Sequence, residues 1–366
     1  MRVILLAGAM FLLVAPPLSW GNIGPPSSGG QIVAEPIGIQ DVEIAHETLS
    51  IDLRPLANCE QVEVKVVYNL INHGAEKTLD LLFVSGAAGV NNFHVWLDDQ
   101  SISSHPAADA AIPASWRTPK ETPSLQDDQK LSYLAYGSQP PVPHAFSVVI
   151  PSGQQVLTVQ YQAEAATHRY GNPTVYRQFA YVLAPARSWS AFGGLDVTIH
   201  LPRDWRAACT PALSRIDDTL TGTFTVIPAD AITLTLQAPE GWAYRVVSKV
   251  SIWLFIITIV VAMVLCWRVG LASGRRLISP IDGIRNSRTR AWPLSLAAAI
   301  MSGIAVFGTG VLAINAPDAM LPAGQVNHYG YGQVFAFIGV LMGSMLLVPI
   351  GFVISQVTAS SFKQER

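Results

Sequence analysis

The stretch SIWLFIITIVVAMVLCW at Ser251–Trp267 decides the architecture of this chain, because it is continuously apolar and carries no charged residue. Two further stretches of this kind follow, at Pro293–Ile314 and Val334–Ile354. A helix of about 20 apolar residues is long enough to cross a bilayer. The sequence therefore predicts a bundle of three transmembrane α-helices over residues 249–355, followed by a cytoplasmic tail at 356–366.

Basic residues predict how these helices are oriented. The segment between the first two helices is rich in arginine: Arg268, Arg275, Arg276, Arg285, Arg288 and Arg290. The segment Asn315–Gln333 contains no Lys or Arg. Because loops rich in Lys and Arg stay in the cytoplasm, we expect the N-terminal domain outside and the C-terminus inside a cytoplasmic (plasma) membrane. The arginines either only set this topology or also contact anionic lipid head groups.

The N-terminus predicts export. Arg2 and the apolar run Val3–Val14 have the order of a secretory signal peptide, which we expect at residues 1–21 with cleavage after Gly21. An uncleaved anchor is the alternative. Residues 22–31, NIGPPSSGGQ, predict a linker.

Residues 32–248 predict a mainly β ectodomain. Strict alternation in Gln61–Asn69 is typical of a half-buried antiparallel strand. In Val42–Leu53 the alternation changes phase near His46, which predicts a β-bulge. Many short strands separated by Gly and Pro turns favour an antiparallel β-sandwich, Ig-like or related.

A long segment at Ser103–His144 interrupts the strand pattern and is rich in Pro, Ala and polar residues. Leu125–Tyr136 within it suggests a short helix. A loop of this length is unusual in a compact domain. It is either a binding loop or a tolerated insertion.

Four stretches of the ectodomain carry a family resemblance: ETLSIDL, VEVKVVYNLIN, LTVQYQAEA and FAYVLAPARSWSAFGGLDVTIHLP. In their order they resemble a loose group of exported bacterial proteins of unknown function. The rhythm of the last stretch, with Trp189 between two strands, is also similar to N-terminal β-sandwich domains of some metallopeptidases. The resemblance implies an Ig-like or related sandwich and carries over no catalytic residue.

No motif of known chemistry occurs in the chain. H-E-x-x-H, G-x-S-x-G and the Walker A pattern are absent, and the ectodomain histidines lack metal-ligand spacing. We therefore expect no catalytic residue, no metal and no cofactor. Residues 22–248 carry 13 Lys+Arg and 22 Asp+Glu, a net charge of 13 − 22 = −9, which argues against a nucleic-acid partner.

Cys59 and Cys209 lie in the predicted ectodomain, where an oxidising compartment permits a disulfide between them. Spacing alone does not decide whether they are close enough to bond. The pairing is therefore a possible disulfide.

Small residues recur at helical spacing in the second and third apolar stretches: Ser295, Ala299 and Gly303, then Gly339 and Gly343. Such residues let membrane helices approach closely. They predict either packing among the chain's own helices or docking onto a partner membrane protein.

These observations favour a membrane-anchored extracytoplasmic binding or assembly module without catalysis of its own. We expect it to be a subunit of, or accessory to, an envelope complex, in contact with membrane lipids and with a membrane or extracytoplasmic protein partner. Two alternatives stay open. One is a signalling or transport accessory that acts through the Arg-rich inner loop, and the other is a hydrolase with an unrecognised site.

Overall fold

The structure is a computed structural model. It describes residues 41–58, 60–87, 89–110, 112–113, 116–126, 129–133, 142–168, 173–276, 287–322, 324–326 and 331–361. The predicted signal peptide and linker, Cys59, Arg285 and residues 362–366 of the predicted tail lie outside the described residues.

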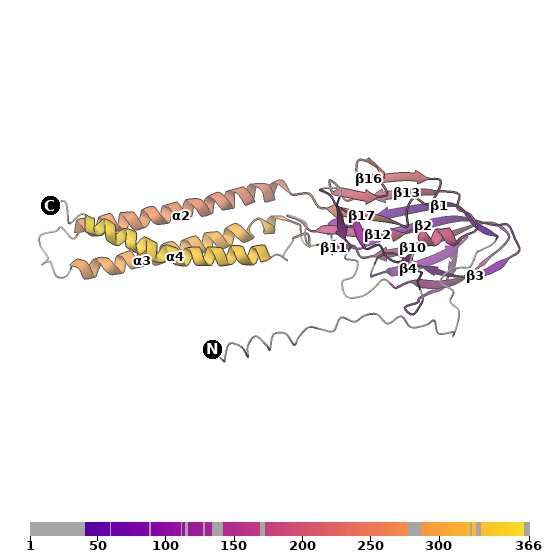
Figure 1. The fold of residues 1–366 in the computed structure, drawn as a ribbon, viewed down its shortest axis with the longest axis horizontal. Coiled ribbons are helices and arrows are strands. Elements are labelled where there is room, and N and C mark those ends of the chain that lie inside the picture. The colour runs from indigo at the N-terminus through magenta and orange to yellow at the C-terminus, as the bar shows by residue number, and fades with distance from the viewer. Residues whose placement is uncertain are drawn as a thin grey trace, which may run out of the picture. The chain divides into compact units, whose positions relative to one another are not determined.

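The described N-terminal part is a large, mostly antiparallel β domain (Figure 1). Its largest sheet has eight strands in the order β15-β16-β13-β1-β2-β10-β4-β5. Their bounds are β1 Val42–Asp52, β2 Val62–Asn72, β4 Asn91–Leu97, β5 Gln100–Ile102, β10 Gly153–Ala163, β13 Leu195–His200, β15 Ser214–Ile216 and β16 Thr219–Phe224.

Three smaller sheets complete the described β domain. The four-stranded sheet runs β11-β12-β17-β14, the three-stranded sheet β3-β9-β6, and β7 pairs with β8. Their bounds are β3 Lys77–Phe83, β6 Ser104–Pro106, β7 Glu121–Pro123, β8 Lys130–Ser132, β9 His144–Ile150, β11 Ala166–His168, β12 Tyr176–Val182, β14 Arg206–Thr210 and β17 Ala231–Gln237. Short 3-10 helices are η1 Arg54–Asn58, η3 Ala184–Ser188 and η4 Asp318–Met320.

The eight-stranded and four-stranded sheets contribute to one hydrophobic core. Leu49 of β1, Val64 of β2 and Val159 of β10 are buried in the same cluster as Phe179 of β12 and Leu234 of β17. Each strand supplies every second residue to this core because strand side chains alternate between the two faces of a sheet.

Strand β1 contains the predicted bulge. Its pairing with β2 shifts register between Ile44 and His46. Ile44 is buried before the shift, and Glu47 and Leu49 are buried after it. The sequence predicts an antiparallel sheet, but β1 pairs with β13 in parallel.

The long segment Ser103–His144 holds the short strands β6, β7 and β8. The helix suggested for Leu125–Tyr136 is wrong at Lys130–Ser132, which form β8. Strands β7 and β8 form an antiparallel hairpin, in which Glu121 pairs with Ser132.

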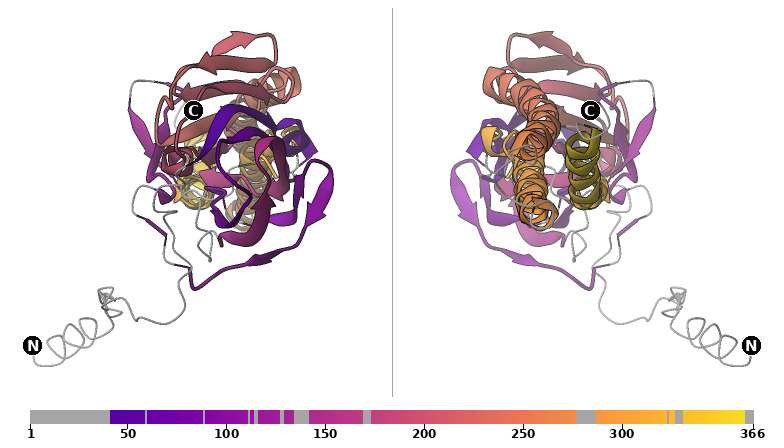
Figure 2. Two further views of the ribbon diagram at one scale, coloured as in Figure 1. Left: turned by 90° about the vertical axis from the view of Figure 1, so that its right-hand side faces the viewer. Right: turned by 90° about the vertical axis from the view of Figure 1, so that its left-hand side faces the viewer.

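Three long apolar helices follow the β domain: α2 Trp242–Arg276, α3 Ser287–Asn315 and α4 Tyr331–Ser361 (Figure 1; Figure 2). All three are long and apolar enough to cross a membrane, which indicates a membrane protein. The 35 residues of α2 rise about 1.5 Å each, so this helix is longer than the roughly 30 Å hydrocarbon layer of a bilayer.

Candidate functional site

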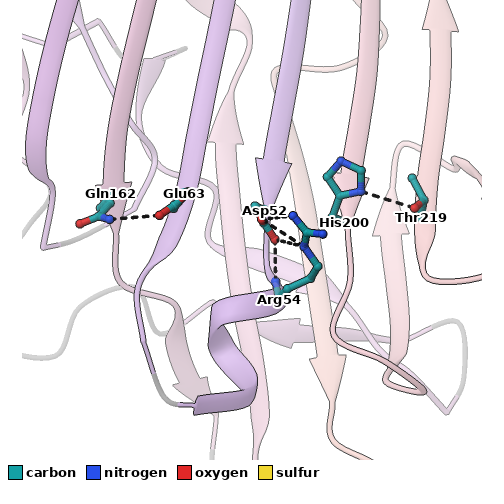
Figure 3. Close-up of polar contacts among 6 residues, drawn as sticks. All are labelled: Asp52, Arg54, Glu63, Gln162, His200 and Thr219. Atoms are coloured by element: carbon teal, nitrogen blue, oxygen red, sulfur yellow. Dashed lines mark hydrogen bonds and ion pairs between the residues drawn. The ribbon is translucent and has the colours of Figure 1, made fainter.

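A row of polar side chains crosses five neighbouring strands of the eight-stranded sheet (Figure 3). The strand register sets Asp52 of β1 beside His200 of β13 and Glu63 of β2. Thr219 of β16 and Gln162 of β10 extend the row at either end. All five residues are partly or fully exposed, whereas their neighbours along each strand are buried. We call these five residues the polar row.

Hydrogen bonds hold the polar row in place. Arg54 donates from Nε to Asp52 Oδ1 at 2.9 Å and from Nη2 to Asp52 Oδ2 at 2.6 Å, which is a bidentate pair. These hydrogen bonds hold the pKa of Asp52 below its usual range. Gln162 Nε2 donates to Glu63 Oε1 at 3.3 Å. The row therefore presents donors and acceptors in a fixed order.

A cleft of about 310 Å³ opens beside the polar row. Its lining includes Arg54, Arg203 and Asp218 together with His200 and Thr219 of the row. Its charges are paired with opposite ones: Arg54 with Asp52, Arg203 with Asp204, and Asp218 with Arg215. Because the charges balance, the cleft suits hydrogen bonding to polar groups rather than capture of an ion.

A second polar chain lies on the same sheet face. His46 Nε2 lies 2.9 Å from Asp196 Oδ2, and Thr223 Oγ1 donates to Asp196 Oδ1 at 2.7 Å. These hydrogen bonds lower the pKa of Asp196. Within the described residues there is no group of three or more His, Cys, Asp or Glu side chains that could hold a metal ion.

One carboxyl group is buried in the core. Glu47 is 1% exposed, and it accepts a hydrogen bond from the Tyr181 hydroxyl at Oε1, at 3.3 Å. The Tyr181 hydroxyl lies 3.1 Å from that of Tyr68. Glu47 Oε2 is buried and has no hydrogen-bond partner among the described residues. Burial raises the pKa of Glu47 to about 7, so the carboxyl group is partly protonated at neutral pH.

Three of the predicted small residues lie at helix contacts. Ser295 and Ala299 are fully buried, and Ser295 Oγ is 2.8 Å from Ser355 Oγ. A Cβ atom added at Gly303 would lie 2.7 Å from Val348 Cγ2. The structure thus brings these residues of α3 against α4.

The predicted pair in α4 is placed differently. A Cβ atom added at Gly339 or Gly343 would meet no described atom within 4 Å. These two glycines therefore do not serve close packing within the described part of the chain.

A glycine at a tight helix contact and a glycine without close neighbours are expected to respond differently to the same substitution. A Cβ atom at Gly270 of α2 would lie 2.6 Å from the backbone oxygen of Ser355, which cannot move out of its helix. Gly270→Val is expected to destabilise the helix bundle by about 1–3 kcal/mol relative to Gly339→Val, since both changes carry the same helix propensity. Unfolding of the detergent-solubilised full chain measures both. Equal unfolding midpoints for the two variants would contradict the close contact of α2 with α4 at Gly270.

The predicted cysteine pair is only partly described. Cys209 lies in β14 as a free, partly buried cysteine, and burial raises the pKa of its thiol to about 12. As a free thiol, Cys209 is therefore protonated at neutral pH. Because Cys59 lies outside the described residues, the disulfide stays a prediction.

The arginines of the predicted inner loop lie at the ends of two helices. Arg268 is exposed on α2. The helix bounds also include Arg275 and Arg276 in α2 and Arg288 and Arg290 in α3. Contact with lipid head groups stays a prediction.

The connection between α3 and α4 contacts the β domain. The backbone N–H of Val175 donates to Gln325 O at 3.0 Å. The Gln325 side chain is fully buried and donates from Nε2 to Leu56 O at 3.2 Å. Arg177 Nη2 donates to Gly324 O at 2.7 Å. Sequence reasoning missed this contact, because its partners are far apart along the chain and carry no motif.

The chain matches no protein-family model and no curated protein sequence. Solved structures give faint likenesses. An M1 zinc metallopeptidase from Deinococcus radiodurans is 12% identical at a TM-score of 0.28, over 57% of this chain and 46% of that one. The leukotriene A4 hydrolase from Saccharomyces cerevisiae is 12% identical at a TM-score of 0.32, over 63% and 35%. The chain thus spans less than half the length of either enzyme, and scores this low establish no shared activity.

Proposed function

We propose that this protein is a membrane-anchored extracytoplasmic binding or assembly module, a subunit of or accessory to an envelope complex, without catalysis of its own. In this proposal the two larger sheets form an Ig-like or related β-sandwich. The three helices cross the cytoplasmic membrane and leave the C-terminus inside.

The observation that carries the proposal is the hydrogen-bonded contact between the α3–α4 connection and the β domain. Segments that bond to each other lie on the same side of a membrane. The β domain leads directly into the start of α2, and the connection joins the end of α3 to the start of α4. The arginines therefore belong to the opposite ends of α2 and α3, as expected for an inner loop.

The polar row and its cleft supply the surface for binding. The row runs over five strands. Its side chains are held by hydrogen bonds in the absence of a partner. Interfaces between proteins that form and separate have a polar rim and about one hydrogen bond per 100–200 Å². A charge-balanced surface of this kind favours a protein partner with polar groups at its contact.

The orientation is tested by cysteine labelling. In a chain that carries Cys59→Ser and Cys209→Ser, we introduce either Ser101→Cys in β5 or Ser287→Cys at the start of α3. An impermeant maleimide added to right-side-out membrane vesicles is expected to label the first variant at once and the second only after detergent is added. Immediate labelling of both would contradict the proposed orientation.

The binding surface is tested by co-purification from membranes in mild detergent. We expect a stoichiometric protein partner whose recovery falls at least fivefold with the double change Arg54→Ala and His200→Ala. The control is Lys77→Ala, which removes an exposed ion pair with Asp41 elsewhere in the β domain. A clean monomer, or a partner retained equally by all variants, would contradict the proposal.

A further inference from the structure

A second and larger cleft, of about 640 Å³, lies where the β7–β8 hairpin meets β17. Ala231 and Thr233 of β17 and Thr210 of β14 line one side of it, and residues 117–124 line the other. Its volume falls within the range of small-molecule sites. The hairpin belongs to the long segment Ser103–His144. From the sequence, this segment is either a binding loop or a tolerated insertion.

Buried hydrogen bonds fix the hairpin wall. Thr122 of β7 is 1% exposed. Its Oγ1 accepts from Gln178 Nε2 at 2.6 Å and from Thr235 Oγ1 at 2.9 Å. Gln178 Nε2 also donates to Ser132 O of β8 at 3.0 Å. Both partners of Thr122 are fully buried, so loss of these bonds would leave polar groups unpaired in a low-dielectric environment. The cleft is therefore held open before a ligand binds, which lowers the cost of binding.

The cleft carries an excess of positive charge. Lys130 Nζ pairs with Glu121 Oε2 at 3.4 Å, and Asp230 pairs with Arg187. Arg117 and Lys120 also line the cleft, with exposed side chains. Neither forms an ion pair with an acidic residue among the residues that the structure describes. A domain with a net charge of −9 over residues 22–248 thus presents, at one concave place, two cations that form no ion pair with any described acidic side chain.

The remaining lining is rich in hydroxyl and amide groups. Thr118, Ser124 and Thr210 supply hydroxyl groups, and Gln129 supplies an amide. Aromatic and large aliphatic side chains, which anchor peptide ligands in pockets, do not occur among the described lining residues. The geometry points to an acidic carbohydrate as the ligand, with a carboxylate held by Arg117 and Lys120 and its hydroxyls by Thr210 and Ser124. This inference goes beyond the proposed assembly role, because it uses a different surface and a small ligand.

The test is calorimetric titration of the detergent-solubilised full chain with a galacturonic acid trimer. The methyl-esterified trimer, of the same length but without the charges, is expected to bind at least tenfold more weakly. The double variant Arg117→Gln, Lys120→Gln is expected to lose at least tenfold in affinity for the charged trimer, because it removes two charge-assisted contacts. The charge-matched control Lys65→Gln, Lys77→Gln changes two cations that line neither cleft and keeps the affinity of the parent protein.

Three outcomes would overturn the inference. The first is no heat of binding at millimolar trimer. The second is an equal loss of affinity in the control variant, which would assign the effect to net charge. The third is equal binding of inorganic phosphate, which would make the cleft a simple anion site. None of these outcomes bears on partner recovery through the polar row, so the two proposals fail separately.

Discussion

Replacing Glu47 with Gln is expected to raise the free energy of unfolding by about 3 kcal/mol at pH 8.5 and to leave it nearly unchanged at pH 4. The physical reason is the pKa of this buried carboxyl group, raised from 4.5 to about 7 by desolvation. Between these values the folded state binds more protons than the unfolded state. The stability that the protonated carboxyl group of Glu47 contributes is therefore fully present below pH 4.5 and is lost as the pH rises through 7. Gln mimics the protonated form at every pH.

Denaturant unfolding of the detergent-solubilised full chain across pH 4 to 8.5 measures this effect. Glu76→Gln is the matched control, because it makes the same chemical change at an exposed position. We expect the control to change stability by less than about 0.5 kcal/mol at any pH. Parallel pH profiles for the native protein and the Glu47→Gln variant would show that Glu47 is charged and solvated.

Gly193→Ala is expected to destabilise the β domain by on the order of 3 kcal/mol or to prevent its folding. A Cβ atom added at Gly193 would lie 2.1 Å from the backbone oxygen of Ala45. This contact cannot relax easily, because the Gly193 N–H donates to Ile44 O at 2.8 Å and the Glu47 N–H donates to Gly194 O at 2.8 Å. These two hydrogen bonds hold residues 193–194, which precede β13, close to the bulge of β1.

Gly194→Ala is the control for this prediction, since it adds the same methyl group one residue later. Its nearest neighbours would be the His46 ring at 3.2 Å and the backbone oxygen of Phe224 at 3.3 Å, both much farther away than 2.1 Å, so we expect a clearly smaller loss of stability. The yield of the detergent-solubilised full chain and its free energy of unfolding measure both variants. Equal losses would mean that the bulge adjusts freely and that its geometry does not constrain residue 193.

The features that the sequence predicted are those coded by local pattern. The three apolar stretches correspond to three long helices, and the phase change near His46 corresponds to the bulge. The burial of Glu47 could have been predicted too, because counting back by two from Leu49 places it on the core face. The apolar residues of this strand alone do not reveal that a carboxyl group shares their buried face.

Features that depend on distant pairings were beyond the sequence. The parallel pairing of β1 with β13 sets Asp52 beside His200, and nothing near either residue encodes this. The same holds for Thr122 and Gln178, which are fixed to each other only after the hairpin meets the four-stranded sheet. Spacing along the chain gives no measure of such distances, so the polar row and the second cleft emerge only from the fold.

The ends of the eight-stranded sheet bear on how copies of this protein behave when crowded. Its edge strands, β15 and β5, have three residues each, with bounds Ser214–Ile216 and Gln100–Ile102. An edge strand offers unpaired backbone groups to any neighbouring chain, and short edges limit that offer. Copies of a protein that are confined to a membrane surface collide with each other far more often than copies in free solution. The short edge strands therefore limit self-aggregation. Lengthening β5 or β15 is expected to increase aggregation of the protein at high expression.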